Sequence, residues 1–433
     1  MKKACIALFL SLVATIAGSA ATTWYVGPGD DIQAVINSAA DGDTIVFAPG
    51  TYNLSATIDV TKTLTLLGPQ AGVDPRPSAG TTRSPGDPTS EAIIDGGGTV
   101  KSLFKIRAND VRIEGFEIRN GTGDLVTSPS DTLQHRPVVR YNIIHDSTGD
   151  EGVQLKHVSD ALIEYNRVYG TAGDAINIGY TSSGGVIQYN EVHDIRSPDA
   201  AIYVYQTENV TIRGNLVYDV YNNDGIKLGS KNGGDATRRG GLIIGNVVMN
   251  TAQDGITVYM SDVVVEGNTV TGSTSENGAI YLAWGISNIV IRYNTIVDST
   301  LNTHKWGTPG GITIGSAVNA STVQIYGNTI TGNTPVDVAN FATGAPLLDA
   351  TGNWWGQDTG PLSDQIAGNV AYSPWLGNDP SAPVWTFIVA RAGPELPAGY
   401  LQTALDLARD GDVVLVKTGE YETQALIDKS IVL

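Results

Sequence analysis

Aromatic and polar residues recur at one position of a repeated short strand, and their types suit the binding of a sugar. Seven segments share two apolar positions with one residue between them, which is predicted to point outward. These residues form an outward ladder: Gln154, Asn177, Tyr203, Lys227, Thr257, Tyr281 and Thr313. Rings stack on sugar faces while polar groups bond hydroxyls. Together with the next outward position, the ladder predicts these substrate-binding residues: Tyr203, Tyr205, Tyr259, Tyr281, Lys156 and Asn177.

Acidic residues stand just before four of the same strands and could hold a cation. They form an acidic column of Glu151, Asp174, Asp224 and Asp254. Carboxylate oxygens are the ligands that Ca²⁺ prefers, so we predict these four residues as metal ligands and Ca²⁺ as the cofactor that they could hold. Asp-Gly pairs are also ordinary corner sequences, so a purely structural role of the column is the alternative.

Chemistry on a uronic acid would need more than a cation. A lyase or epimerase also requires a base for the proton next to the carboxylate and a group for the leaving oxygen. We predict Lys227 as the base, with Arg238 and Arg239, on the long loop that also carries Lys231, holding the substrate carboxylate. No complete catalytic motif of a lyase is present, and neither a glycosidase pair of carboxylates nor a histidine metal motif is clear. Whether the chain is an enzyme therefore stays open.

A longer pattern places these residues on a repeated unit. It reads apolar, any, apolar, any, any, Asn, any, apolar, with successive asparagines separated by 24, 24, 25, 31, 22, 26 and 34 residues. Self-similarity at such a period indicates a solenoid. The asparagines are Asn142, Asn166, Asn190, Asn215, Asn246, Asn268, Asn294 and Asn328.

The repeat predicts an all-β fold. Its apolar residues alternate with a period of two and are mostly β-branched, which favours short strands. Stacked parallel strands place equal positions about 4.8 Å apart, so inward asparagines could bond to one another as stacked amides do. A leucine-rich horseshoe would need helices and a leucine framework, and a propeller would need a longer period. We therefore predict a parallel β-helix.

The N-terminal segment agrees with this fold. Residues 32–39 place their apolar side chains on one helical face, which predicts an amphipathic helix that caps the first turn and protects its edge. The stretch IQAVINSAADGDTIVFAPGTY, residues 32–52, closely resembles the start of proteins in the pectate-lyase-like β-helix superfamily. The resemblance implies a single-stranded, right-handed parallel β-helix and says little about activity.

Three further segments complete the domain organisation. Residues 69–91, rich in Pro, Gly, Ser and Thr, predict a long surface loop or a disordered insertion within a β-helix of residues 22–378. Residues 353–356 (NWWG) resemble a motif near the end of many surface β-helix proteins, and we expect them to cap the coil. Residues 401–421 repeat the opening, so residues 379–433 predict the start of a second, truncated β-helix unit. We interpret the chain as a fragment of a longer tandem protein.

The N-terminus predicts export. Lys2 and Lys3, an apolar stretch and small residues ending at Ala21 have the form of a signal peptide over residues 1–21. We expect secretion or display at the cell surface, with the periplasm as an alternative. The lone Cys5 falls in this segment, so no disulfide is expected. No later stretch is long and apolar enough to span a membrane.

Charge and composition narrow the function. A formal net charge of -18 opposes binding to nucleic acid. We predict an exported monomer that binds, and could cleave, an extracellular polysaccharide or cell-surface glycan. The alternative is a non-enzymatic cell-surface or adhesion module.

Overall fold

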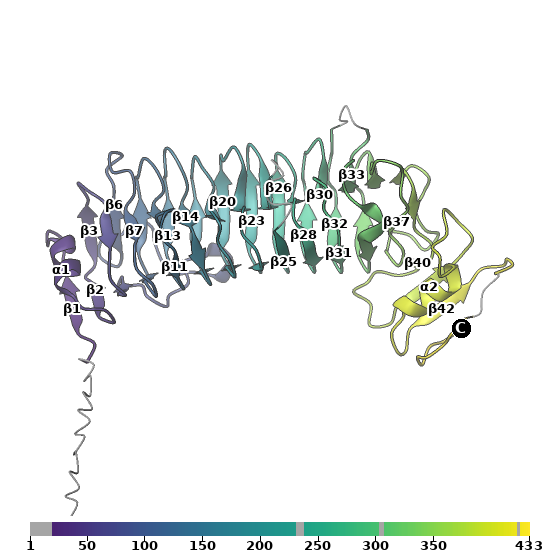
Figure 1. Ribbon diagram of the computed structural model, residues 1–433, viewed down its shortest axis with the longest axis horizontal. Coiled ribbons are helices and arrows are strands. Elements are labelled where there is room, and N and C mark those ends of the chain that lie inside the picture. The colour runs from purple at the N-terminus through teal and green to yellow at the C-terminus, as the bar shows by residue number, and fades with distance from the viewer. Residues whose placement is uncertain (1–19, 231–237, 303–306, 422–424) are drawn as a thin grey trace, which may run out of the picture.

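The computed structural model describes residues 20–230, 238–302, 307–421 and 425–433. Most of the predicted signal peptide, together with Lys231, lies outside the described residues. In the described part the chain winds as a coil of short strands, and Figure 1 shows the turns stacked side by side along one axis. Each turn passes through three parallel sheets, which we call A, B and C. The predicted all-β parallel β-helix is confirmed.

Within the described residues, sheet A has 14 strands and sheet B has 11. Sheet A consists of β1 (Thr23–Val26), β2 (Thr44–Phe47), β5 (Thr65–Leu67), β8 (Arg112–Glu114), β12 (Val138–Arg140), β16 (Leu162–Glu164), β19 (Val186–Gln188), β22 (Val210–Arg213), β25 (Arg239–Ile244), β28 (Ser261–Glu266), β31 (Ile289–Arg292), β34 (Val323–Tyr326), β37 (Leu348–Asp349) and β39 (Val370–Ala371). Sheet B consists of β3 (Gly50–Asn53), β6 (Ala92–Asp95), β9 (Glu117–Arg119), β13 (Ile143–His145), β17 (Arg167–Tyr169), β20 (Glu191–Ile195), β23 (Leu216–Val220), β26 (Val247–Thr251), β29 (Thr269–Thr271), β32 (Thr295–Val297) and β35 (Thr329–Thr331).

Sheet C has 12 strands in the same described ranges. They are β4 (Ile58–Val60), β7 (Phe104–Ile106), β10 (Val126–Thr127), β14 (Val153–Lys156), β18 (Ile176–Gly179), β21 (Ala200–Val204), β24 (Asp224–Leu228), β27 (Ile256–Val258), β30 (Gly278–Leu282), β33 (Gly310–Ile314), β36 (Val336–Asn340) and β38 (Ile366–Ala367). A small pair, β11 (Gln134–His135) and β15 (Val158–Ser159), lies outside the three sheets, as do the short 3₁₀ turns η1 (Pro77–Ala79) and η2 (Ala320–Thr322).

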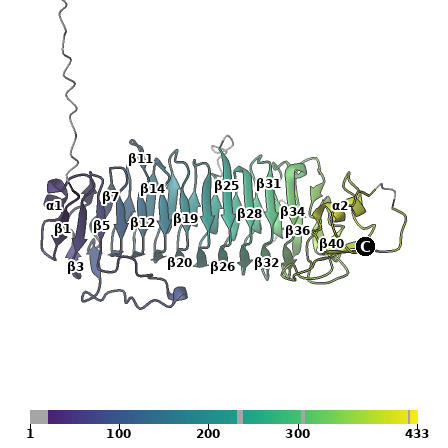
Figure 2. The same cartoon turned by 90° about the horizontal axis from the view of Figure 1, so that it is seen from below.

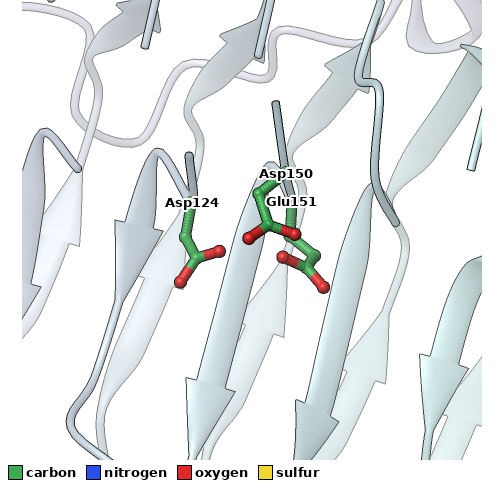
Figure 3. A group of neighbouring side chains, drawn as sticks. All are labelled: Asp124, Asp150 and Glu151. Carbon is green, nitrogen blue, oxygen red and sulfur yellow. The ribbon is translucent and has the colours of Figure 1, made fainter. Parts of the chain in front are cut away.

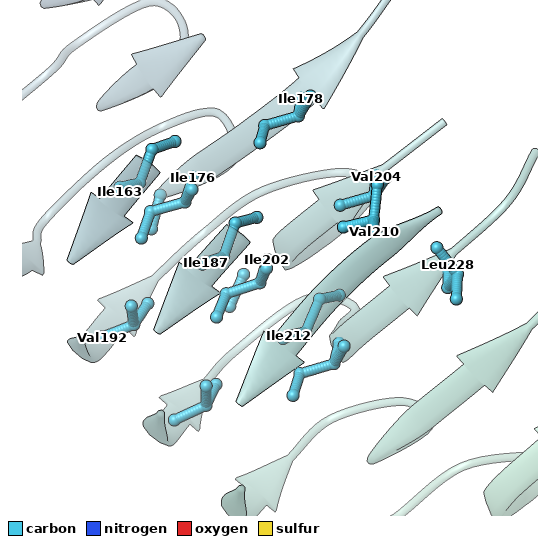
Figure 4. Close-up of a cluster of buried hydrophobic side chains, with 14 of the residues drawn as sticks. Ile163, Ile176, Ile178, Ile187, Val192, Ile202, Val204, Val210, Ile212 and Leu228 are labelled. Atoms are coloured by element: carbon cyan, nitrogen blue, oxygen red, sulfur yellow. The ribbon is translucent and has the colours of Figure 1, made fainter. Parts of the chain in front are cut away.

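The core is a continuous apolar column inside the coil. Ile163, Ile187 and Ile212, on successive strands of sheet A, are fully buried, and Ile176 and Ile202 meet them from sheet C. Figure 4 shows these side chains stacked from turn to turn in the interior. Alternation along each strand sends β-branched residues inward and leaves the residue between them on the outer face.

The recurring asparagines form the predicted ladder. The side-chain amide of Asn142 donates to Oδ1 of Asn166, the amide of Asn166 to Asn190, and the pattern continues through the last predicted member, Asn328. Asn328 then donates to Asn353, so the NWWG segment supplies a ninth rung. Each asparagine satisfies buried backbone groups at the bend between sheets A and B, which explains why a polar residue recurs in an apolar pattern.

The residue before each asparagine makes the bend. Tyr165, Tyr189 and Gly245 have φ of 51°, 53° and 63°, the left-handed conformation that glycine adopts most easily. Either Tyr or Gly occupies this position in every repeat, because the turn needs the conformation and the outer surface tolerates either residue.

The N-terminal helix α1 (Ile32–Ser38) is present, with Asp31 accepting a hydrogen bond from the amide of Ala34 as its N-cap. Ile32 and Ile36 are buried in the main core. Figure 1 places α1 at the N-terminal end of the coil. Its role as a cap remains a prediction.

The loop of residues 69–91 is ordered, so the disordered alternative is wrong. Figure 2 shows it running along the outside of the coil beneath the sheet B strands. Arg83 and Glu91 form an ion pair of 2.7 Å with both side chains fully buried. Backbone amides of Ser78 and Gly86 donate to Glu191 and Glu117 on sheet B. These long-range contacts hold a segment whose composition alone is typical of a flexible loop.

The C-terminal residues repeat the opening in three dimensions. Helix α2 (Tyr400–Leu407) connects β41 (Thr386–Val389) to β42 (Val413–Val416), which pair in parallel as β1 and β2 do around α1. Asp43 and Asp412 accept equivalent amide hydrogen bonds beside these strands. β40 (Trp375–Leu376) joins the same small sheet, and its apolar side chains form a second core cluster. The β41–α2–β42 arrangement resembles the opening, whereas a second β-helix unit beginning at residue 379 stays a prediction.

Candidate functional site

The outward ladder is confirmed by the register of sheet C. Successive Cα partners join Gln154 to Asn177, Asn177 to Tyr203, and Tyr203 to Lys227, and then continue through Thr257, Tyr281 and Thr313. Neighbouring members are therefore about 4.8 Å apart along the axis of the coil. Asn177, Tyr203 and Tyr281 therefore lie in one line on the outer face of sheet C, and the other three predicted substrate-binding residues, Lys156, Tyr205 and Tyr259, each follow a member of the ladder by two residues.

The ladder is less exposed than an outward position suggests. Lys227 is 4% exposed, Gln154 6% and Asn177 2%. Neighbouring side chains and corner segments cover these residues although they lie outside the apolar core. Tyr203 and Tyr281 are partly exposed. The expectation of a solvated ladder is wrong for the lysine and the amides.

Tyrosines enclose the middle of this face. The rings of Tyr203 and Tyr205 are 5.0 Å apart, and Tyr180 meets Tyr205 edge to face at 5.4 Å. A cleft of about 450 Å³ is lined by these rings together with Glu151 and Asn177. Tyr259, further along, is largely buried and contacts Tyr281 edge to face. Four of the predicted substrate-binding residues therefore line or border a real cleft: Asn177, Tyr203, Tyr205 and Lys156.

Lys227, the predicted base, is held by its neighbours. Its Nζ lies 3.1 Å from Oδ2 of Asp224 and donates at 2.8 Å to the carbonyl oxygen of Asp199. The same nitrogen lies over the ring of Tyr203, 5.4 Å from its centre. These contacts occupy the amine, so proton abstraction would require it to leave its ion pair.

Arg238 and Arg239 do not join Lys227 on sheet C. Arg239 begins β25 in sheet A and its guanidinium pairs with Asp262 at 3.0 Å. Arg238 directly precedes this strand and is partly exposed. Their predicted role on a substrate carboxylate stays a prediction, without support from this arrangement.

Three members of the acidic column use their oxygens within the fold. Asp174 accepts hydrogen bonds from Ser197, Asn177 and the amide of Ala200. Asp224 and Asp254 likewise accept from side chains and backbone amides at their corners. These contacts agree with the structural alternative for Asp174, Asp224 and Asp254, and their role as metal ligands stays a prediction.

Burial of Asp254 makes stability depend on pH. Burial, and then the charge of Asp224, raise the pKa of Asp254 from 3.8 to about 7. A carboxyl group with a raised folded-state pKa stabilises the fold below its unfolded pKa, and this contribution is lost as pH rises through the folded pKa. The free energy of unfolding should therefore fall between pH about 4 and about 7. In Asp254→Asn this fall should be smaller, because the amide does not titrate.

Urea denaturation across this pH range measures the effect. Asp110→Asn is the matched control, since Asp110 is an exposed aspartate at the corner between β7 and β8 and pairs with Arg136. Equal pH slopes for Asp254→Asn and the unaltered protein would contradict the prediction.

The fourth member, Glu151, belongs to a different group. Side-chain oxygens of Asp124, Asp150 and Glu151 lie within 4.8 Å of one another. Figure 3 shows the three carboxylates converging, Asp124 from one turn and Asp150 and Glu151 from the next. Asp124 and Glu151 occupy the same phase, two residues before the paired strand positions Val126 and Val153. We call these three residues the carboxylate cluster.

The cluster has oxygens that lack a hydrogen-bond donor. Oδ1 of Asp124 and Oε2 of Glu151 are buried, and no donor among the described residues reaches them. Burial, followed by contact with Asp150 and Asp124, raises the pKa of Glu151 to about 11. A proton shared between carboxylates, or a cation, must satisfy these atoms. The donor set is all oxygen, which fits Ca²⁺, so Asp124, Asp150 and Glu151 could hold this ion.

Basic side chains border the cluster. Nζ of Lys156 lies 3.0 Å from Oδ2 of Asp124. A cleft of about 350 Å³ next to it is lined by Lys101, Lys105 and Arg107 as well as Lys156. No ion pair joins Lys101 or Lys105 to another residue in the described ranges, whereas Arg107 pairs with Asp59. The face thus carries cationic groups next to a candidate cation site.

Sequence reasoning missed Asp124 and Asp150. Asp124 could have been found by extending the acidic column one turn back, but β10 is only two residues long and its apolar signal is weak. Asp150 precedes Glu151 outside the repeating phase, so no periodic signal marks it. Only the stacking of turns brings the three together.

Comparison with known proteins identifies the family. The model of the right-handed β-helix region matches residues 99–237 and 200–351. The chain belongs to this family. The match confirms the predicted right-handed fold. No curated protein sequence matches the chain.

Solved structures of the same right-handed β-helix fold include two A-modules of mannuronan C-5 epimerases from Azotobacter vinelandii. For AlgE4 the TM-score is 0.50 at 14% identity, covering 73% of this chain and 85% of that one. For AlgE6 the TM-score is 0.50 at 12% identity, covering 81% and 89%. The pectate lyase Pel9A is similar with a TM-score of 0.47 at 14% identity, covering 72% and 80%. At these identities the likeness shows the fold alone.

Among the described residues of this β-helix, no helix has the length and apolar character needed to cross a membrane.

Proposed function

We propose that the outer face of sheet C binds an acidic polysaccharide, with a divalent cation held by the carboxylate cluster bridging to the sugar carboxylates. The observation that carries the proposal is the convergence of Asp124, Asp150 and Glu151, with two buried oxygens that no donor from the described part of the chain satisfies. A bound Ca²⁺ would supply ligand positions for carboxylates of the polysaccharide. Export to the cell surface or beyond, where such polymers occur, is part of this proposal.

The charge of the neighbouring cleft supports an anionic ligand. The chain has 44 acidic and 26 basic residues, yet Lys101, Lys105, Arg107 and Lys156 gather in one cleft of sheet C. Cationic side chains in a recess attract anions more strongly than the same charges spread over a surface. The cleft and the cluster together suit a polymer that carries a negative charge on each unit.

The geometry favours binding over cleavage. Lys227 lies three strands along sheet C from the strand that follows Glu151, or roughly 14 Å at about 4.8 Å per strand. A base at that distance cannot remove a proton next to a carboxylate that the cluster holds. The proposed role is therefore that of a glycan-binding module, in agreement with the non-enzymatic alternative.

A lyase or epimerase is the second candidate, on one observation. Lys156 places an amine directly beside Asp124, so a base and a cation could meet at one sugar unit. General-base catalysis requires such a contact. Product formation distinguishes this candidate from binding alone.

The test is binding of purified protein to polygalacturonate, alginate and neutral dextran, with Ca²⁺ or with a chelator. We expect the acidic polymers to bind only with Ca²⁺, and Glu151→Gln to weaken that binding by about 10–100-fold, the usual cost of disturbing a metal site. Ca²⁺ should also raise the Tm of the unaltered protein but not of the variant, because the ion stabilises the state that binds it.

Glu266→Gln is the matched control, since this variant makes the same chemical change on sheet A. There Glu266 pairs with Arg292. Absorbance of unsaturated products, followed in the same samples, reports lyase activity. Binding that survives the chelator, or the absence of any bound acidic polymer, would overturn the proposal.

A further inference from the structure

A third cleft lies on the same face, further toward the C-terminus. It has a volume of about 310 Å³ and lies where β30 and β33 end. Its aromatic lining consists of Tyr281, Trp284 and Phe341, with Asn277 and Ser316 among the polar residues. A small apolar recess with a few polar groups at its edge is typical of a ligand site.

Trp284 is presented to solvent by the backbone. It is 48% exposed, unlike most large aromatic side chains of this chain, and its φ is 70°. Corner residues such as Tyr165 and Tyr189 have the same left-handed conformation, so the backbone at Trp284 follows the general geometry of the bends. The ring of Tyr259 meets the indole edge to face at 6.3 Å, which fixes the indole beside the cleft.

Gly315 lines the cleft at a position that has no room for a side chain. A Cβ there would come within 2.8 Å of the carbonyl oxygen of Leu282 and 3.2 Å of the hydroxyl of Tyr281. Asn277, at the edge, is held by its contact with Asp254. The cleft therefore combines aromatic side chains with small and polar residues.

The cleft and the carboxylate cluster lie along the same sheet, the cluster just before its strands and Trp284 just after them. Tyr281 belongs to the same register column as Gln154, five strands further along sheet C, which is roughly 24 Å at about 4.8 Å per strand. The partly exposed Tyr203 lies between the two. A single sugar cannot reach both sites, but a linear chain lying along the axis can.

We propose that the cleft formed by Tyr281, Trp284 and Phe341 is a stacking subsite for a pyranose ring of the polysaccharide whose carboxylates engage the carboxylate cluster. The inference rests on the proposed function and adds the direction and the minimum length of the bound polysaccharide to it. The apolar face of the ring lies on the indole of Trp284, and its hydroxyls meet the polar edge of the cleft. The ligand is a linear polymer laid along the coil.

The test compares short and long acidic oligosaccharides on Trp284→Gly. Glycine adopts a positive φ without strain, so this variant removes the ring and should keep or raise the Tm. A uronate octamer with Ca²⁺ should bind the variant about tenfold more weakly than it binds the unaltered protein. A uronate trimer, which reaches only the carboxylate cluster, should bind both equally. Trp284→Phe should retain most of the octamer affinity.

Tyr293→Gly is the matched control, because Tyr293 is also half-exposed at 44%, has a φ of 59° and lies at the bend between sheets A and B. Two results would overturn this inference but leave the proposed function standing. One is an octamer affinity that Trp284→Gly does not change, and the other is an equal loss of affinity for trimer and octamer. If neither oligosaccharide binds the unaltered protein, the proposed function and the inference are both wrong.

Discussion

Replacing Arg83 with methionine is expected to lower the free energy of unfolding by about 3–5 kcal/mol, the usual cost of leaving one member of a buried ion pair without its partner. Both side chains of the Arg83–Glu91 pair are fully buried. Arg83 also donates to the carbonyl oxygens of Tyr141 and Phe116 on two further turns. The substitution therefore leaves a buried carboxylate without its partner and removes the donor to the Tyr141 carbonyl, whereas the Phe116 carbonyl still accepts from the amide of Ile143.

Urea denaturation measures this loss, and limited proteolysis within residues 69–91 shows whether the loop detaches. Arg136→Met is the control, since the Arg136–Asp110 pair is exposed at 59% and 42% and should contribute about 0–1 kcal/mol. The double variant Arg83→Met, Glu91→Leu should recover part of the loss, because it removes the unpaired charge. A single variant as stable and as protease-resistant as the unaltered protein would show that the pair does not anchor the loop.

Replacing Asn246 with alanine is expected to lower the free energy of unfolding by about 2–5 kcal/mol, because each buried group left unpaired costs about 1–3 kcal/mol. The amide of Asn246 donates to Ile212 and Asn268, and its oxygen accepts from the backbone and the side chain of Asn215. Alanine removes the bonds to the backbone amide of Asn215 and the carbonyl oxygen of Ile212 and interrupts the ladder in the middle of the coil, although Asn268 still accepts from the backbone amide at position 246.

Asn222→Ala is the control for this change. Asn222 is an exposed residue whose amide donates to the carbonyl oxygen of Arg196, and its replacement should alter stability by less than about 0.5 kcal/mol. Thermal and urea denaturation of both variants give the comparison. Equal stabilities would mean that the ladder contributes little beyond the backbone pairing of the sheets.

The candidate site divides into residues that periodicity predicts and residues that it does not. Gln154, Tyr203 and Lys227 share a phase of the repeat, so their alignment on sheet C follows from the spacing. The burial of Lys227 does not follow, because it depends on the contacts that Asp224, Asp199 and Tyr203 make around it. Asp150 lies outside the repeating phase, and its approach to Asp124 depends on how one corner stacks on the next.

The sequence by itself determined the coil, its register and its asparagine ladder, because identical residues at equal phase must stack when parallel strands repeat. Only the tertiary structure decided where the loop of residues 69–91 docks, which carboxylates converge, and that Arg239 faces Asp262 rather than Lys227. These contacts join corners and loops of unequal length from different turns. Their geometry depends on non-local packing, which a local repeat pattern does not encode.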